Sequence, residues 1–202
     1  MTKNRWVVLI GFFLFAAALF YIFSYSSQET TASQHKIESI SDTGYAFGNE
    51  TAPVKIVEFS NFECPSCQKS HQEIKEALKQ AIDSGAVYYI FKHTSLDQFT
   101  KSPLVSERVA SLEDDETKPE VMDQIFQEQQ SWSKLNEKEL IEYLEEMNLT
   151  QAVDLEEERA TIQEETKELN VSGTPTIFVN DKKVQGALTE KAFKKLLQSS
   201  LE

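Results

Sequence analysis

Cysteine is scarce in this sequence, and that scarcity narrows what the cysteines can do. The 202 residues contain two cysteines, Cys64 and Cys67. A structural disulfide stabilises a protein mainly by closing a long loop of the unfolded chain. A bridge between residues this close in sequence closes almost no loop, so pairing of Cys64 with Cys67 would serve chemistry rather than stability.

Positive charge is also in short supply. Lys and Arg number 20 against 33 Asp and Glu, which gives a net charge of -13. Nucleic-acid binding relies on clustered Lys and Arg that contact phosphates, so this balance argues against a nucleic-acid partner. The fractions of hydrophobic residues (40%) and charged residues (26%) are typical of a soluble globular domain.

Long hydrophobic runs are absent except for one near the N-terminus. Residues 6–23 contain no charge, and Lys3 and Arg5 precede them. This run is just long enough to cross a bilayer and longer than a typical signal-peptide core. The preceding positive charges predict a cytoplasmic N-terminus and a domain outside the cell membrane. We therefore expect a single-pass anchor over residues 1–23 and a flexible tether over 24–43, with a cleaved signal peptide as the alternative.

Hydrophobic spacing beyond the tether predicts one α/β domain over residues 44–202. A β-branched run at 54–59 precedes a helical pattern, and a second buried strand is expected at 87–91. Helical spacing then dominates from about 101 to 169. A strand pattern returns at 171–179, followed by a hairpin and a final helix. This order indicates an α/β fold with an inserted helical block.

The motif Cys64-Pro65-Ser66-Cys67 lies where the first predicted strand gives way to the first helix. Residues one helical turn apart are close enough to form a disulfide. Free amide groups and the helix dipole at a helix N-terminus stabilise a thiolate, and Pro65 suits the first turn. We expect Cys64 to be the exposed sulfur that reacts with substrates, and Cys67 to be the shielded resolving partner.

A zinc site is the main metal-binding alternative for these cysteines. His71 follows Cys67 by four residues, but a structural zinc site needs a fourth ligand. The other histidines are His35, in the tether, and His93. We therefore predict no metal and no cofactor other than the Cys64–Cys67 disulfide itself.

The residues around the motif resemble the DsbA-like proteins of the thioredoxin fold. The similarity lies in residues 52–67 and 173–180, and it extends over about 44–201 with the helical block between. With its predicted anchor, the chain is similar to the membrane-anchored disulfide-forming proteins of Gram-positive bacteria. The resemblance implies a thioredoxin fold with an inserted helical domain, and it implies that Pro175 is a cis-proline facing the disulfide.

The resemblance also implies roles for single residues. Cys64 would be the nucleophile, and the backbone of Thr174 would pair with an extended substrate segment. Glu58 matches the family's buried acid and would exchange a proton with Cys67, unless it is a strand-end residue that faces water. Ser66 stands where strongly oxidising members often carry His, and its lack of charge predicts a milder oxidant.

The sequence and the resemblance together predict an enzyme that introduces disulfides into exported proteins with reduced cysteines. The family implies that a quinone-linked membrane protein reoxidises it. A reductase or an isomerase using the same residues is the alternative within this class. A non-catalytic binding or metal-binding module is the alternative outside it, although a cysteine pair at a helix start is chemically reactive.

Overall fold

A computed structural model of the protein describes residues 37, 39–112 and 117–202. The predicted anchor and most of the predicted tether lie outside these residues. Within the described ranges, none of the helices combines the length and the hydrophobicity that a bilayer span needs. Residues 40–202 form a single structural unit.

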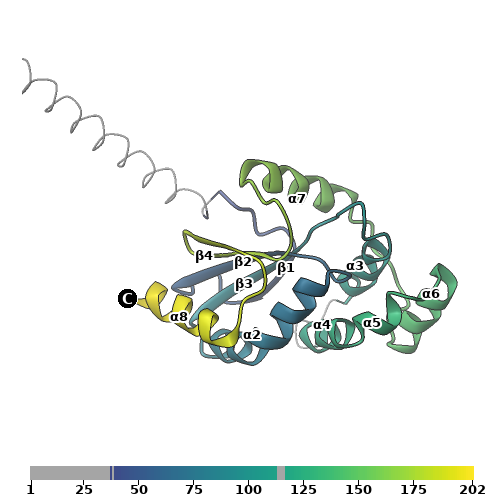
Figure 1. The fold of residues 1–202 in the computed structure, drawn as a ribbon, viewed down its shortest axis with the longest axis horizontal. Helices are drawn as coiled ribbons and strands as arrows, with labels where there is room; N and C mark the ends of the chain where they lie inside the picture. The colour runs from purple at the N-terminus through teal and green to yellow at the C-terminus, as the bar shows by residue number, and fades with distance from the viewer. Residues whose placement is uncertain (1–36, 38, 113–116) are drawn as a thin grey trace, which may run out of the picture. The chain divides into compact units, whose positions relative to one another are not determined.

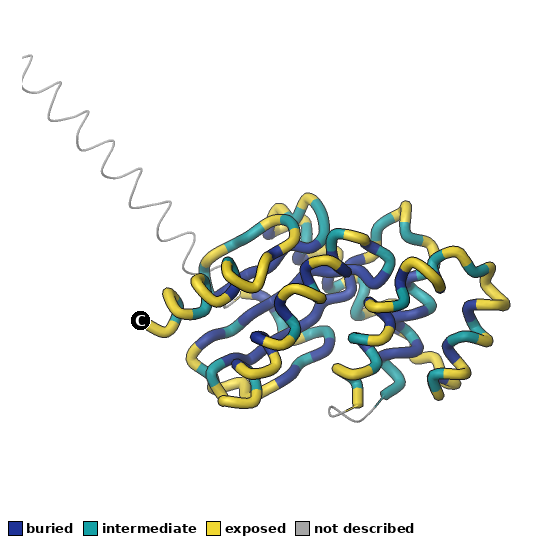
Figure 2. The backbone as a smooth tube through the Cα atoms, turned by 60° about the horizontal axis from the view of Figure 1, so that its bottom comes forward, coloured by how far each residue is buried: buried dark blue, intermediate teal, exposed yellow. Residues whose placement is uncertain are grey.

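In the described chain, a five-stranded mixed sheet forms the centre of this unit (Figure 1). The spatial order of the strands is β1 (Tyr45–Gly48), β3 (Val87–His93), β2 (Val54–Ser60), β4 (Thr176–Val179) and β5 (Lys182–Gln185). β2 and β3 are parallel, and the other neighbours are antiparallel. All residues of β2 and β3 except Lys55 are buried, because both faces of the sheet are covered, and the buried segments run through the centre of this unit (Figure 2).

Helices lie on both faces of the sheet (Figure 1). α2 (Pro65–Asp83) connects β2 to β3 and packs beside the C-terminal helix α8 (Glu190–Leu201), whereas α7 (Glu156–Glu168) lies on the opposite face. Thr189 caps the N-terminus of α8, because its hydroxyl accepts the N–H of Ala192.

The helical block between β3 and β4 begins with α3 (Ser102–Ala110) and α4 (Thr117–Gln127). It continues with α5 (Gln129–Trp132) and α6 (Glu137–Glu146), and α7 ends it. Asn136 and Glu139 form a capping box at the start of α6. The Trp132 indole is fully buried and donates to the carbonyl oxygen of Ile125 at 2.7 Å. The buried hydrophobic side chains of the block form an interior that continues into the core under the sheet.

Two strands differ from the expectation. β1 was not predicted; its Tyr45 and Phe47 point inward and stack on Phe91 and Tyr89 of β3. The strand expected from residue 171 begins only at Thr176. Its N-terminal part cannot join the ladder continuously because Pro175 has no N–H to donate.

A buried ion pair lies on the α7 face of the sheet. Lys92 Nζ is 2.9 Å from Glu165 Oε2, and the two side chains are 0% and 10% exposed. Lys92 also donates to the carbonyl oxygen of Thr43, and the N–H of Ser41 donates to Glu165 Oε1. The end of the segment predicted to be a tether therefore contacts the sheet and α7.

Candidate active site

The two cysteines lie where β2 leads into α2. Cys64 is the N-cap of α2, with φ -83° and ψ 119°, and Pro65 occupies the first turn. The N–H groups of Cys67 and Gln68 both donate to the Cys64 carbonyl at 3.0 Å. The first turn of this 19-residue helix has no acidic residue, so nothing there offsets the positive end of the helix dipole beside Cys64.

The two sulfurs differ less in exposure than the sequence predicts. Cys67 is fully buried, as expected, but Cys64 is only 6% exposed. The reason is the loop before β4: the Cys64 thiol donates to the carbonyl oxygen of Thr174 at 3.5 Å. The Thr174–Pro175 peptide bond in this loop is cis. This loop therefore contacts the sulfur that substrates are expected to attack.

The electrostatics of the two sulfurs are opposite. Hydrogen bonding from the Cys67 thiol is the largest effect that lowers the pKa of Cys64, which falls to about 5 although burial opposes it. The side chain of Thr174 and the backbone N–H groups of Cys67 and Ser66 lower this pKa further. Burial and the neighbouring Cys64 raise the pKa of Cys67 above its ordinary value. Ser66 therefore acts on Cys64 through its amide, and the pair holds one thiolate and one thiol at neutral pH.

Glu58 lies in the middle of β2 and is 2% exposed, so it does not face water. The hydroxyl of Tyr89, on the parallel strand β3, donates to Glu58 Oε2 at 2.9 Å. Burial raises the pKa of Glu58 above its ordinary value, although the Ser60 and Tyr89 hydroxyls favour the carboxylate. A carboxyl whose pKa is raised in this way is suited to accept and donate a proton during a reaction.

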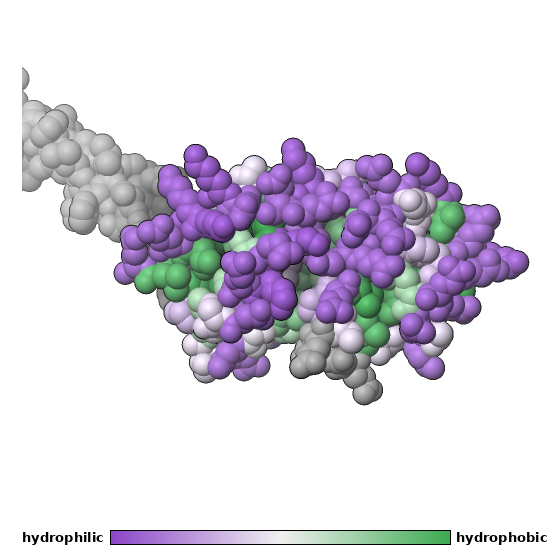
Figure 3. All heavy atoms as spheres, turned by 90° about the horizontal axis from the view of Figure 1, so that it is seen from below, coloured by the Kyte–Doolittle hydropathy of each residue, from purple (hydrophilic) through white to green (hydrophobic). Residues whose placement is uncertain are grey.

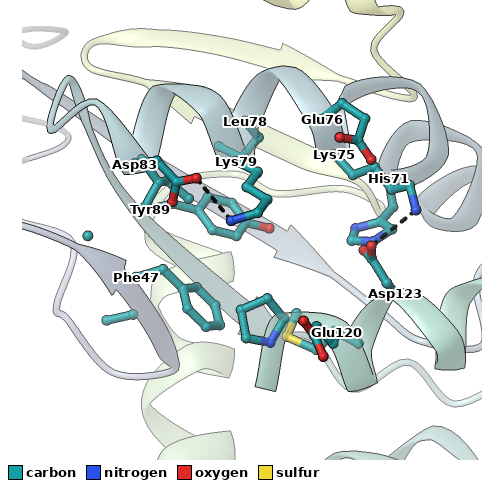
Figure 4. Close-up of a pocket in the computed structure, with 15 residues that line it drawn as sticks. Phe47, His71, Lys75, Glu76, Leu78, Lys79, Asp83, Tyr89, Glu120 and Asp123 are labelled. Atoms are coloured by element: carbon teal, nitrogen blue, oxygen red, sulfur yellow. Dashed lines mark hydrogen bonds and ion pairs between the residues drawn. The ribbon is translucent and has the colours of Figure 1, made fainter. Parts of the chain in front are cut away.

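A pocket of about 540 Å³ lies on the far side of Tyr89, between β1, α2 and α4 (Figure 4). Tyr89, whose hydroxyl donates to Glu58, is among the residues that line the pocket. His71 lines the other end, hydrogen-bonded through Nε2 to Asp123 and stacked on Phe126. His71 is thus engaged by α4, and in the described chain no three His, Cys, Asp or Glu side chains converge as metal ligands.

Two residues that the sequence did not single out hold the active-site loop. The Gln129 amide on α5 is buried and donates to the carbonyl oxygens of Phe62 and Cys64, at 2.7 and 3.0 Å. Glu63 accepts the N–H groups of Lys101 and Ser102 at the start of α3. The helical block therefore fixes the loop that carries Cys64. Only tertiary contacts reveal Gln129, whereas the position of Glu63 next to Cys64 was a visible signal.

Comparisons with known proteins agree with this geometry. A family model described as Thioredoxin matches residues 40–199. Disulfide bond formation protein D of Bacillus subtilis is 25% identical over 175 residues, which cover 77% of this chain and 76% of that protein. The crystal structure of oxidised BdbD from Bacillus subtilis has a TM-score of 0.60 at 22% identity and covers 81% of this chain and 95% of that one.

A further relative is a much longer protein. The Na(+)/H(+) antiporter NhaA 3 of Salinispora tropica is 26% identical over 172 residues, or 79% of this chain. The chain spans a quarter of the length of that relative. The family match, the paired cysteines at the start of α2 and the cis-proline loop agree with one another. The chain therefore belongs to the thioredoxin family and is a DsbA-like thiol–disulfide oxidoreductase of thioredoxin fold.

Proposed function

We propose that the protein introduces disulfides into exported proteins through its Cys64–Cys67 pair. The observation that carries this direction is the lowered pKa of Cys64. A thiolate that is stabilised in the reduced enzyme is a good leaving group, and its stability makes the disulfide form more oxidising. The raised pKa of Cys67 keeps the second sulfur protonated, so the pair has one defined point of attack.

The reaction follows from this asymmetry. A substrate thiolate attacks Cys64 Sγ, the Cys64–Cys67 bond breaks, and Cys67 leaves with the electron pair and takes up a proton. A second substrate thiolate attacks the substrate sulfur of the mixed disulfide and releases Cys64 as a thiolate. The substrate loses two electrons and the enzyme gains them. In this scheme the buried acid Glu58 is the proton donor for Cys67.

The substrate is proposed to bind through its main chain. The loop at Thr174 and Pro175 borders Cys64 and offers backbone groups that can pair with an extended segment. In the described chain, Val153 and Leu201 are the only exposed large hydrophobic side chains. The face seen in Figure 3 is mainly hydrophilic, with separate hydrophobic patches. Main-chain pairing recognises many sequences, which suits an enzyme that acts on diverse exported proteins.

The oxidising strength is proposed to be intermediate. The attacking cysteine has a pKa of about 7 in thioredoxin and about 3.5 in DsbA, and the value of about 5 for Cys64 lies between them. Their reduction potentials are about -270 and about -120 mV. We therefore expect a potential between these two, in line with an uncharged Ser66 between the cysteines.

The setting of the reaction is part of the proposal. The hydrophobic run at residues 6–23 and its preceding charges support a membrane anchor that holds the domain outside the cytoplasm. The reduced pair would then be reoxidised by a quinone-linked membrane protein. The excess of acidic residues argues against a nucleic-acid partner.

The reduction potential of the Cys64–Cys67 couple, measured by equilibration with glutathione redox mixtures, tests the direction. A value at or below that of thioredoxin, about -270 mV, would make the protein a reductant and overturn the proposal. Cys67→Ser should accumulate a mixed disulfide with a reduced, unfolded substrate protein, because the resolving sulfur is gone. Cys64→Ala should neither form this adduct nor restore disulfides to the substrate.

A further inference from the structure

Ser60, at the end of β2, has a buried hydroxyl without a partner. It is fully buried, and among the described residues its Oγ accepts and donates no hydrogen bond of good geometry. Buried polar groups in folded proteins are normally paired, so an unpaired one calls for an explanation. Ser60 follows Glu58 by two residues on the same strand, and alternate residues of a strand share a face. The hydroxyl and the carboxyl therefore lie on the same side of the sheet.

The same hydroxyl lies beside two ionisable groups of the proposed reaction. Burial raises the pKa of both Glu58 and Cys67, and the Ser60 hydroxyl opposes this effect at both groups, so it is within interaction distance of each. On its other side, the Glu58 carboxyl is held by the Tyr89 hydroxyl. The Ser60 hydroxyl therefore acts on both the buried acid and the buried sulfur, although it forms no hydrogen bond of good geometry with either.

The reaction needs a proton to move at this position. Cys67 is fully buried, and burial raises its pKa, so its thiolate must be protonated as it leaves Cys64. Bulk water cannot reach a sulfur with no exposed surface. A side chain that both accepts and donates a proton can move it between two buried groups, and a serine hydroxyl does both.

We propose that the Ser60 hydroxyl relays the proton between Glu58 and Cys67. When the Cys64–Cys67 bond breaks, Ser60 gives its proton to the departing Cys67 sulfur and takes one from the Glu58 carboxyl. Glu58 is left as a carboxylate and recovers its proton later. When the reduced enzyme is reoxidised and the Cys64–Cys67 bond forms again, the same protons move in the opposite direction. The inference rests on the proposed thiol–disulfide exchange and assigns a residue to its proton step.

The other titratable groups near Ser60 cannot supply the proton in place of Glu58. His93, on β3, lies opposite Ser60 in the register of the two strands. Burial lowers the pKa of His93 to about 3, so this residue is neutral at physiological pH. The pKa of Tyr89 is raised well above its ordinary value. Cys64 is bonded to the substrate sulfur when the Cys64–Cys67 bond breaks, so it has no proton to give. Glu58 is therefore the acid from which the relay draws.

Single-turnover reduction of the oxidised full chain by dithiothreitol tests the relay, with acid quenching and mass analysis of the labelled thiols. A positioned acid–base group contributes about 10²–10⁴-fold, and water entering the vacated space recovers part of this. We expect Ser60→Ala to slow the loss of the disulfide about 10- to 100-fold at neutral pH and to change the solvent isotope effect. The control is Ser106→Ala, which changes a fully buried serine on α3; this variant should react like wild type.

A double-mutant comparison separates a relay from a structural effect. If Ser60 acts through Glu58, adding Ser60→Ala to Glu58→Gln should slow the reaction no further. Because other groups set the Cys64 pKa, it should stay near about 5 in Ser60→Ala. If Ser60→Ala folds poorly, Ser60→Thr and Ser60→Val serve instead, since they differ mainly in the hydroxyl; the Thr variant should be the faster one.

Two results would overturn the relay. One is a Ser60→Ala protein that reacts as fast as wild type with an unchanged isotope effect, or Thr and Val variants that react equally. The other is a full additional loss of rate in the Glu58→Gln background. An unreactive wild type would instead overturn the proposed function together with the relay, so the two failures are distinguishable.

Discussion

The stability of the reduced protein should depend on pH in a way that the oxidised protein does not share. In the reduced form Cys64 has a pKa of about 5, whereas a cysteine of the unfolded chain has a pKa of about 8.5. A folded-state pKa below the unfolded one adds stability that is fully present above the unfolded pKa. That stability is lost as the pH falls through the folded pKa. The window for Cys64 therefore runs from about pH 8.5 down to about pH 5.

The magnitude follows from this pKa difference. At pH 7 the thiolate would add about 2–3 kcal/mol to the free energy of unfolding of the reduced form. Cys64 keeps 6% of its surface exposed, and solvent screens part of this interaction, so we expect about 1–3 kcal/mol. Cys67 adds little below about pH 8, because its raised pKa keeps it protonated in the folded chain and an ordinary cysteine is still mostly protonated in the unfolded chain.

Urea denaturation of both redox forms, followed by circular dichroism between about pH 5 and about pH 8, measures this effect. Ionisations common to both forms cancel when the oxidised stability is subtracted from the reduced stability. The disulfide itself closes too short a loop to introduce a pH dependence. The difference should rise with pH in favour of the reduced form. A difference that stays flat over this range would refute the assignment of a low pKa to Cys64.

Three further substitutions test contacts around the site. Gln129→Ala removes the donor to two loop carbonyls, including that of Cys64. The free energy of unfolding should fall by about 1–3 kcal/mol, and thiol exchange should slow. Unchanged values for both would contradict the positioning role. Glu165→Gln leaves Lys92 buried without its partner, which should lower the free energy of unfolding by about 3–5 kcal/mol in urea denaturation. The double change Lys92→Met with Glu165→Leu should lower it much less. Equal losses would show that the two residues are not a coupled ion pair. Asn136→Ala removes a helix cap far from the cysteines and should cost about 1 kcal/mol with no change in exchange rate, so a slower rate would link α6 to the site.

The elements that local spacing encodes are those that the sequence predicted well. β2, α2 and β3 have nearly the expected bounds, because their branched residues, helical spacing and Pro65 are local signals. β1 escaped notice because four residues with one alternation carry little information, and its stability comes from stacking on β3, more than 40 residues away.

The site divides in the same way. Cys64 and Cys67 follow from spacing and helix chemistry alone, whereas Thr174 and Pro175 required the family resemblance, since their closeness to Cys64 depends on the folded chain. The low exposure of Cys64 was not predicted, because the loop that covers it lies 110 residues further along the sequence. Ser60 was within reach of sequence reasoning, because a polar residue two positions after a buried acid shares its face.

The position of Trp132 gives the protein an optical reporter. It is one of two tryptophans in the chain, and the other, Trp6, lies in the predicted anchor. The buried Trp132 indole sits on the same short helix as Gln129, whose amide holds the carbonyl of Cys64. Breaking the disulfide changes the charge at that loop, and this change in charge should alter the fluorescence intensity of Trp132. Intrinsic emission can then follow the redox state of the enzyme in real time, without a label and without a coloured substrate.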